Sequence, residues 1–434
     1  MQQRSTENDR SREEPAGQPQ KAEGDEQARS VADAVARRSY GRLVAFLAAR
    51  THNVAAAEDA LSEAFAAALA DWPLHGCPAN PEAWLLTVAR RRWMDVVRKR
   101  QSSGIVDEEI DLQQIADVLG AERENAEIPD RRLALMFACA HPAIEESIRA
   151  PLILQAILGL DAATIASAFL TSPAAMGKRL VRAKSKIREA GVPFRIPERE
   201  ELAGRLDTVL DAIYAAFGEG WSDADGSDAT RRDLTAESLF LARLVVEMLP
   251  DEPEALGLLA LMLHAEARRR GRRNQYGEYI PLSAQNYALW DAEKIGEAEA
   301  LLRRAGCLGA IGRYQLEAAI QSAHVARCRS GQSNWFEVVQ LYDALLSLTA
   351  SPVVAINRAL AIAELKGPQS GLDALPDSAA DPRLAEYQPW WAARADLLSR
   401  AGMRDESLRA YEIAIGLESD PAVRQFLEKR RAAL

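Results

Sequence analysis

The chain has 434 residues and a formal net charge of −10, with 48% hydrophobic, 27% charged and 6% aromatic residues. These values are ordinary for a globular protein of two or three domains, and they exclude a chain too polar to build a core. No stretch approaches the roughly 20 apolar residues of a membrane span, so we expect no membrane contact. Residues 1–31 are polar and lack the apolar segment of a signal peptide, which predicts a disordered tail.

The cysteines and histidines form no recognisable metal or disulfide pattern. The four cysteines never occur as a C-x-x-C pair, and the five histidines lack metal-ligand spacing. We therefore expect reduced thiols in a cytoplasmic protein, with no metal and no other cofactor. The cysteines are Cys77, Cys139, Cys307 and Cys328.

Charge is distributed unevenly along the chain. Residues 33–100 hold 10 basic and 7 acidic side chains, and residues 131–190 hold 9 basic and 4 acidic ones. Between them, residues 101–130 hold one arginine and nine carboxylates, and residues 201–434 have a net charge of −8. Two basic modules, at 32–100 and 131–192, are thus separated by an acidic linker, and only these modules resemble nucleic-acid binders.

The hydrophobic periodicity is helical almost throughout. Alanine and leucine are abundant, and helix breakers divide the chain near residues 73–81, 101–130, 191–197 and 218–226. We expect an all-α protein with two small helical domains, the second containing a helix-turn-helix, followed by a helical-repeat domain at 193–434.

The sequence of the first module predicts an amphipathic helix at 55–72 and a basic helix at 82–100. The first has an apolar face opposite three carboxylates, and the second starts after the cap Asn80 and Pro81. The apolar face comprises Ala57, Leu61, Phe65, Ala68 and Leu69, and the carboxylates are Glu58, Asp59 and Glu63. The second helix has a stripe of Leu85, Ala89, Trp93 and Val96, and its basic residues are Arg90, Arg91, Arg92, Arg98, Lys99 and Arg100. A merely solvated basic face is the alternative.

The second module carries the most specific local pattern. Asp161 can cap a short helix at 162–169, and Ser172 followed by Pro173 can start another after a three-residue connection. The second helix would bury Met176, Leu180, Ala183 and Ile187, and its outward face would carry Ala174, Ala175, Lys178, Arg179, Arg182 and Lys186. This pattern predicts a helix-turn-helix whose second helix enters the major groove. An isolated helical hairpin with surface lysines is the alternative.

The sequence after the second module predicts a series of paired helices. One stretch, from Trp391 to Ala414, fits the 34-residue tetratricopeptide (TPR) pattern, and looser pairs are expected at 230–249 with 254–270 and at 334–349 with 352–365. The TPR packing positions are Trp391, Ala395, Leu398, Gly402, Tyr411 and Ala414, with Ser407 where alanine is usual. Such arrays stack into curved surfaces that bind other helices or peptides.

The sequence resembles the extracytoplasmic-function (ECF) sigma factors of the sigma-70 family, in the group with a long TPR-like C-terminal extension. The resemblance covers almost the whole chain after the tail. Its anchors are AEDALSEAF at 57–65, NPEAWLLTVAR at 80–90, ASAFL at 166–170, MGKRLVRAKSKIR at 176–188 and IYAAF at 213–217.

The resemblance implies a role for each part. Residues 32–100 would be region 2, which binds core RNA polymerase through Glu58, Asp59 and Glu63 and reads the −10 element with Trp84, Arg90, Arg91 and Arg98. Residues 131–192 would be region 4, which reads the −35 element through Ala174, Ala175, Lys178, Arg179, Arg182 and Lys186. The acidic linker would thread the polymerase cleft, where carboxylates can occupy a channel built for phosphates.

The resemblance predicts a sigma factor, not an enzyme, with core polymerase and promoter DNA as partners and the extension at 193–434 docking on the sigma domains to regulate them. The alternative is a TPR-bearing helix-turn-helix regulator that does not join polymerase. A helical enzyme is a third possibility, but no nucleophile–base pair, metal cluster or phosphate-binding loop supports it. The sequence is compatible with inhibition by the extension and with assistance by it.

Overall fold

The computed structural model describes residues 18–102, 130–169, 171–222, 229–378 and 381–434. Throughout this described part the regular structure is helical, and β-pairing is limited to one isolated bridge between Arg273 and Tyr279. The all-α prediction is therefore confirmed. The chain forms two compact units, Met1–Ala212 and Ile213–Leu434. Among the described helices, none combines the length and apolar character that a membrane span requires.

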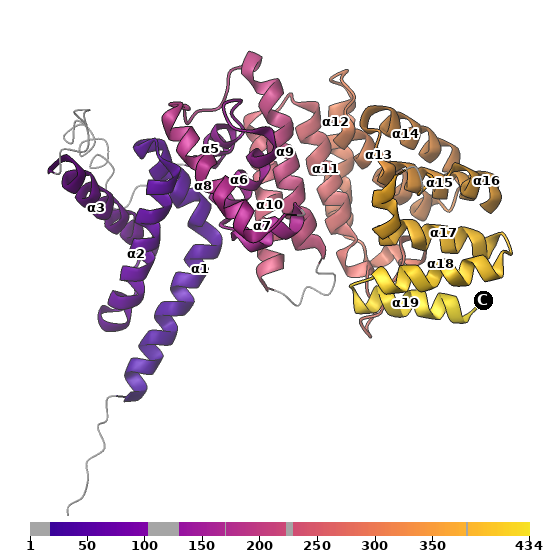
Figure 1. The fold of residues 1–434 in the computed structure, drawn as a ribbon, viewed down its shortest axis with the longest axis horizontal. Coiled ribbons are helices and arrows are strands. Elements are labelled where there is room, and N and C mark those ends of the chain that lie inside the picture. Colours follow the sequence, from indigo (N-terminus) through magenta and orange to yellow (C-terminus); the bar gives the residue numbers. More distant parts are fainter. Residues whose placement is uncertain (1–17, 103–129, 170, 223–228, 379–380) are drawn as a thin grey trace, which may run out of the picture. The chain divides into compact units, whose positions relative to one another are not determined.

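The first unit is organised around a long first helix, α1 (Gln18–Thr51). It lies beside α2 (Val54–His75) and also contacts α3 (Pro81–Ser102) (Figure 1). The disordered tail expected at 1–31 is contradicted for residues 18–31, which belong to α1, and residues 1–17 lie outside the described part. Ala28 is buried, so this part of the helix gains the packing that its polar sequence did not suggest. The predicted linker at 101–130 lies mostly outside the described residues, apart from its two ends.

The second basic module folds as four helices within the same unit. These are α5 (Arg132–Cys139), α6 (Glu146–Leu158), α7 (Ala162–Ala168) and α8 (Pro173–Glu189). Every residue of α5 is buried, because a helix that is apolar on all sides must be surrounded by protein. Helices α1 and α6 approach so closely that a Cβ atom on Gly41 would lie 2.0 Å from the carbonyl oxygen of Ile157. The two modules, expected as separate domains, thus pack directly on each other.

Two positions of the first module differ from the predicted apolar stripes. Val96 is 43% exposed, and Val97 is buried in its place, because the buried positions of α3 follow steps of four residues from Leu85 and Ala89. On α2, Leu69 is exposed, while Ala57, Leu61 and Ala68 form the expected buried face. Leu69 lies one position beyond the buried face, which continues from Ala68 to Trp72. The predicted stripes are otherwise confirmed, with Phe65 and Trp93 half-buried.

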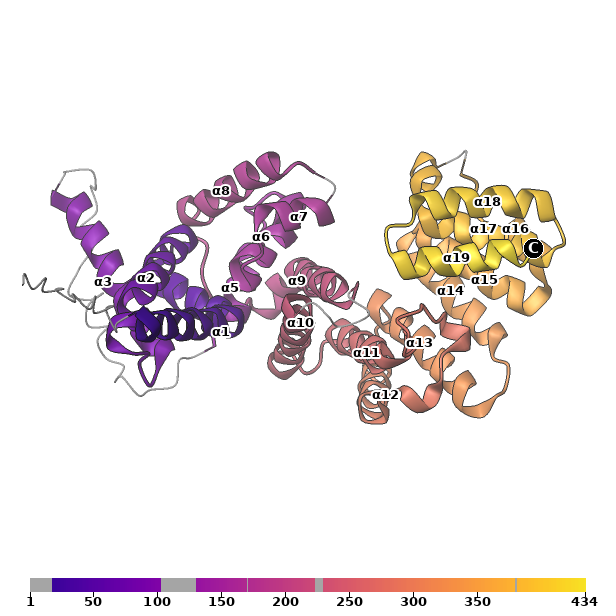
Figure 2. The same ribbon diagram turned by 90° about the horizontal axis from the view of Figure 1, so that it is seen from below.

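The second unit consists of successive helix pairs. It begins within α9 (Arg199–Ser222) and continues with α10 (Ala229–Met248), α11 (Pro253–Ala267), α12 (Ala292–Gly306), α13 (Arg313–Ser330), α14 (Trp335–Thr349), α15 (Pro352–Lys366) and α16 (Pro368–Ala374). It ends with α17 (Gln388–Arg400), α18 (Arg404–Leu417) and α19 (Pro421–Ala432), which lie side by side (Figure 2). Short 3-10 turns occur at Arg269–Gly271, Leu282–Ala284, Tyr287–Leu289 and Pro382–Glu386.

The helix pairs expected from the sequence are present, with one exception at a boundary. The break predicted at 218–226 is too early, because α9 continues through Gly218 to Ser222, and residues 223–228 lie outside the described part. In the pair α17–α18, Ser407 is fully buried, and its hydroxyl donates to the carbonyl oxygen of Ala395 at 2.8 Å. This bond explains how serine replaces the usual alanine without leaving a polar group unsatisfied.

Candidate nucleic-acid interface

Helices α7 and α8 form the predicted helix-turn-helix. The carboxylate of Asp161 accepts a hydrogen bond from the Thr164 amide at 2.7 Å, and the Ser172 hydroxyl accepts one from the Ala175 amide at 3.3 Å. These two caps fix where each helix begins. The predicted core of α8, comprising Met176, Leu180, Ala183 and Ile187, is buried.

The outward face of α8 is basic, as predicted. Ala174, Lys178, Arg182 and Lys186 are exposed, and Ala175 is half-exposed. Small side chains at the start of the helix leave room for close approach to base edges, and three cations then follow the same face. This arrangement is suited to a helix that enters the major groove with its first turn.

Arg179 is not simply directed at solvent. Its guanidinium donates to the Glu145 carboxylate at 3.3 Å and to the Ser147 hydroxyl, both at the start of α6. A hydrogen bond from Ser147, together with the charge of Arg179, lowers the pKa of Glu145. A nucleic acid would therefore have to compete with Glu145 for this arginine.

The basic residues of α3 divide into two groups. Arg91 and Arg98 are exposed, and Arg98 lies 3.9 Å from Asp95. Arg90 is half-buried, with its guanidinium 5.4 Å from the centre of the Phe46 ring. Arg90 therefore contributes to packing between α3 and α1, while Arg91 and Arg98 lie on the exposed side of the helix.

Trp84, which the resemblance assigns to −10 reading, is half-exposed. Its ring meets the buried ring of Trp72 edge to face, with centroids 5.4 Å apart. This contact holds Trp84 at the junction of α2 and α3 and fixes the orientation of its remaining exposed surface.

The three predicted polymerase-binding carboxylates have different surroundings. Asp59 and Glu63 are exposed, and Glu63 lies 3.7 Å from Arg92. Glu58 is not on an open face, contrary to the expectation. It forms an ion pair with Lys184 of α8, in which the two side chains are only 14% and 11% exposed. Burial raises the pKa of Glu58, and the Lys184 ammonium offsets part of that rise.

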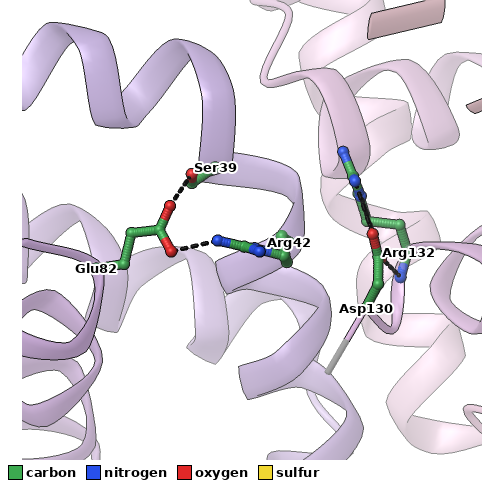
Figure 3. Close-up of polar contacts among 5 residues, drawn as sticks. All are labelled: Ser39, Arg42, Glu82, Asp130 and Arg132. Carbon is green, nitrogen blue, oxygen red and sulfur yellow. Dashed lines mark hydrogen bonds and ion pairs between the residues drawn. The ribbon is translucent and has the colours of Figure 1, made fainter. Parts of the chain in front are cut away.

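Two further polar contacts, which sequence reasoning missed, are a link between α3 and α1 and a local ion pair at the start of α5 (Figure 3). The Glu82 carboxylate accepts hydrogen bonds from Ser39 and Arg42 of α1. Asp130, assigned to the linker, accepts from Arg132 at 2.6 and 3.1 Å. Burial opposes ionisation of Asp130, but the bonds from Arg132 and the charge of Arg42 outweigh it, so its pKa is lowered. The opposite charges of Asp130 and Arg132, two positions apart in the sequence, could have indicated this ion pair.

The sequence matches two protein-family models and one curated protein. Residues 35–103 match the model for sigma-70 region 2, and residues 205–306 match a family of unknown function, DUF6596. The uncharacterized protein R00370 of Rhizobium meliloti (strain 1021) is 36% identical over 371 residues, which cover 85% of this chain and 87% of that protein. No solved structure matches.

The region 2 match coincides with α1–α3, which bear the exposed carboxylates and the basic face described above. This domain implies core RNA polymerase and promoter DNA as partners. The chain therefore belongs to the same family as the rhizobial protein, and it contains a sigma-70 region 2 domain, which supports a sigma factor of the sigma-70 family.

Proposed function

We propose that the chain is an ECF-type sigma factor whose α7–α8 helix-turn-helix serves as region 4 and reads the −35 element. The observation that carries this proposal is the basic outward face of α8, presented by two capped helices in the same compact unit as the region 2 domain. The sites assigned to −10 reading are Trp84, Arg91 and Arg98, with Arg90 in a supporting position. In this proposal the protein is not an enzyme and acts in the cytoplasm.

Run-off transcription with purified core RNA polymerase tests this proposal. The full chain should direct initiation from a defined start on a promoter library, and a −35 deletion should abolish it. A DNA-binding regulator that does not join polymerase would instead fail to co-purify with core enzyme, and that outcome would reject the sigma assignment.

We further propose that the helix pairs after α9 form a TPR-like extension that docks on the sigma domains and regulates them. The net charge of −8 on residues 201–434 is opposite in sign to the basic modules. Covalent linkage raises the effective concentration of such a contact to about the millimolar range, so even a weak interaction is populated. Attraction of this kind is screened by salt.

Truncation tests the regulatory role. The truncated chain should end at Ala212, since residues 193–212 belong to the first unit. Its run-off activity should differ from that of the full chain, with higher activity indicating inhibition by the extension and lower activity indicating assistance. Equal activity at low and high salt would reject a regulatory role.

A further inference from the structure

The second unit contains a cavity of about 590 Å³ that the sigma-factor function does not use. Its walls come from one face of α13, the end of α14 and the start of α15, and Tyr214 of α9 and Leu261 of α11 also line it. This volume lies within the range of small-molecule sites, which combine an apolar surface with a few placed polar groups.

The apolar part of the cavity is preformed. Leu261, Ile320 and Leu345 line it and are almost completely buried, and each comes from a different helix. They are held by the packing of α11, α13 and α14, so a ligand would meet a fixed apolar surface. Such a surface favours a ligand that has an apolar side chain or body.

One cation and one anion stand in the same wall. Arg313 and Glu317 are one turn apart on α13, and the Arg313 Nε lies 2.8 Å from a Glu317 carboxylate oxygen. The Arg313 side chain is 43% exposed and the Glu317 side chain 19%. Ion pairs of this kind within one helix contribute little to stability, so both groups can exchange partners at small cost.

The remaining polar groups are mostly hydrogen-bond donors. Burial, followed by the charge of Glu317, raises the pKa of both Tyr214 and Tyr342 to about 12, so both phenols stay protonated at neutral pH. The side-chain carbonyl oxygen of Gln321 accepts a hydrogen bond from Arg268 at 2.9 Å. The side-chain amino group of Gln321 can therefore donate a hydrogen bond to a ligand. Asn357 adds an exposed amide at the start of α15.

We propose that this cavity binds a small zwitterion of the α-amino acid or dipeptide class with apolar side chains. The carboxylate would meet Arg313 and the neighbouring donors, the ammonium would meet Glu317, and the side chains would lie on the apolar surface. A purely anionic ligand would be opposed by Glu317, and a purely cationic one by Arg313. A ligand that carries both charges replaces the internal ion pair without leaving either residue unpaired.

Calorimetric titration of the full chain with leucyl-leucine tests the proposal. Two analogues serve as controls, N-acetyl-leucyl-leucine, which lacks the ammonium, and leucyl-leucinamide, which lacks the carboxylate. The zwitterion should bind, and each analogue should bind about tenfold more weakly, because each loses a charge-assisted hydrogen bond. Absence of binding by leucyl-leucine and by the free amino acids leucine and phenylalanine would overturn the proposal, as would equal binding of all three dipeptide forms.

Two variants assign the charges to their residues. Arg313→Gln should remove the preference for leucyl-leucine over its amide, while Glu317→Gln should remove the preference over its N-acetyl form. Arg329→Gln, at the exposed end of the same helix, is the matched control and should keep both preferences. Circular dichroism checks that each variant is folded. If folded variants retain the wild-type preferences, the ligand binds elsewhere and the proposal is wrong. None of these readouts depends on transcription.

Discussion

Glu58 of α2 and Lys184 of α8 form an ion pair across two modules that the sequence separates by an acidic linker. The two residues are 126 positions apart, and their side chains are nearly withdrawn from water. Glu58 belongs to the surface that we assign to polymerase binding, and Lys184 lies on the helix that we assign to promoter reading. One contact therefore links the two candidate functional surfaces.

Breaking this pair from one side should destabilise the first unit. Lys184→Met leaves the Glu58 carboxylate without its partner in a desolvated position, and we expect a loss of about 3 kcal/mol in the free energy of unfolding. Glu58→Gln should cost less, and the double variant should recover part of the loss. Urea unfolding of the four proteins measures the coupling energy. Strictly additive effects would mean that the pair has no energetic role.

The exposed carboxylates of α2 should act differently from Glu58. Reversing Asp59 and Glu63 to lysine should weaken binding to core polymerase by about tenfold, with little change in stability, because both side chains are in water. The reversal Asp251→Lys, at a highly exposed position of the second unit, is the matched control. Fluorescence titration of core enzyme at constant salt measures the effect. Unchanged affinity would remove Asp59 and Glu63 from the polymerase interface.

On α8, the exposed cations should dominate promoter binding. Alanine at Lys178 or Arg182 should lower −35-dependent affinity, and each lost phosphate contact should reduce the salt slope by about one. Arg179 must first leave Glu145, so Glu145→Gln should release it and strengthen DNA binding at low salt. Arg188→Ala, at the exposed end of α8, is the control. If Glu145→Gln weakens binding, Arg179 does not contact DNA.

Local features of the fold were predictable because their causes are local. The caps Asn80, Asp161 and Ser172 each bond an amide three residues ahead, and a short stretch of sequence is sufficient to recognise them. The buried stripe of α8 follows from helical periodicity alone. The all-α fold and the helix pairs follow from the same signals.

The packing of the two modules was not predictable in this way. Periodicity identifies an apolar face but does not identify the helix that covers it. The close approach of Gly41 to Ile157 and the ion pair of Glu58 with Lys184 both join distant parts of the chain. Glu58 consequently looked like a surface carboxylate. The apolar sequence of α5 did hold a clue, since a helix without a polar face requires partners on all sides.

Two buried histidines should make the second unit sensitive to acid. Burial lowers the pKa of both His264 and His324 to about 4; the charge of Glu299 opposes this shift at His264, whereas the charge of Arg327 adds to it at His324. The His264 ring lies 3.6 Å from the Glu299 carboxylate, and His324 Nδ1 lies 2.8 Å from an Arg327 amino group, next to which a second positive charge is unfavourable.

The direction of the pH effect follows from these depressed values. The folded state holds both rings neutral, whereas the unfolded chain binds protons below about pH 6.5. Stability from the neutral rings is therefore complete above pH 6.5 and is lost as the pH falls towards 4, by up to about 3 kcal/mol for each histidine. Urea unfolding at pH 7, 5.5 and 4.5 should show this loss. His264→Gln and His324→Gln should each flatten the pH dependence, whereas His75→Gln, at an exposed position on α2, should leave it unchanged. Parallel pH profiles for all four proteins would show that other groups cause the acid sensitivity.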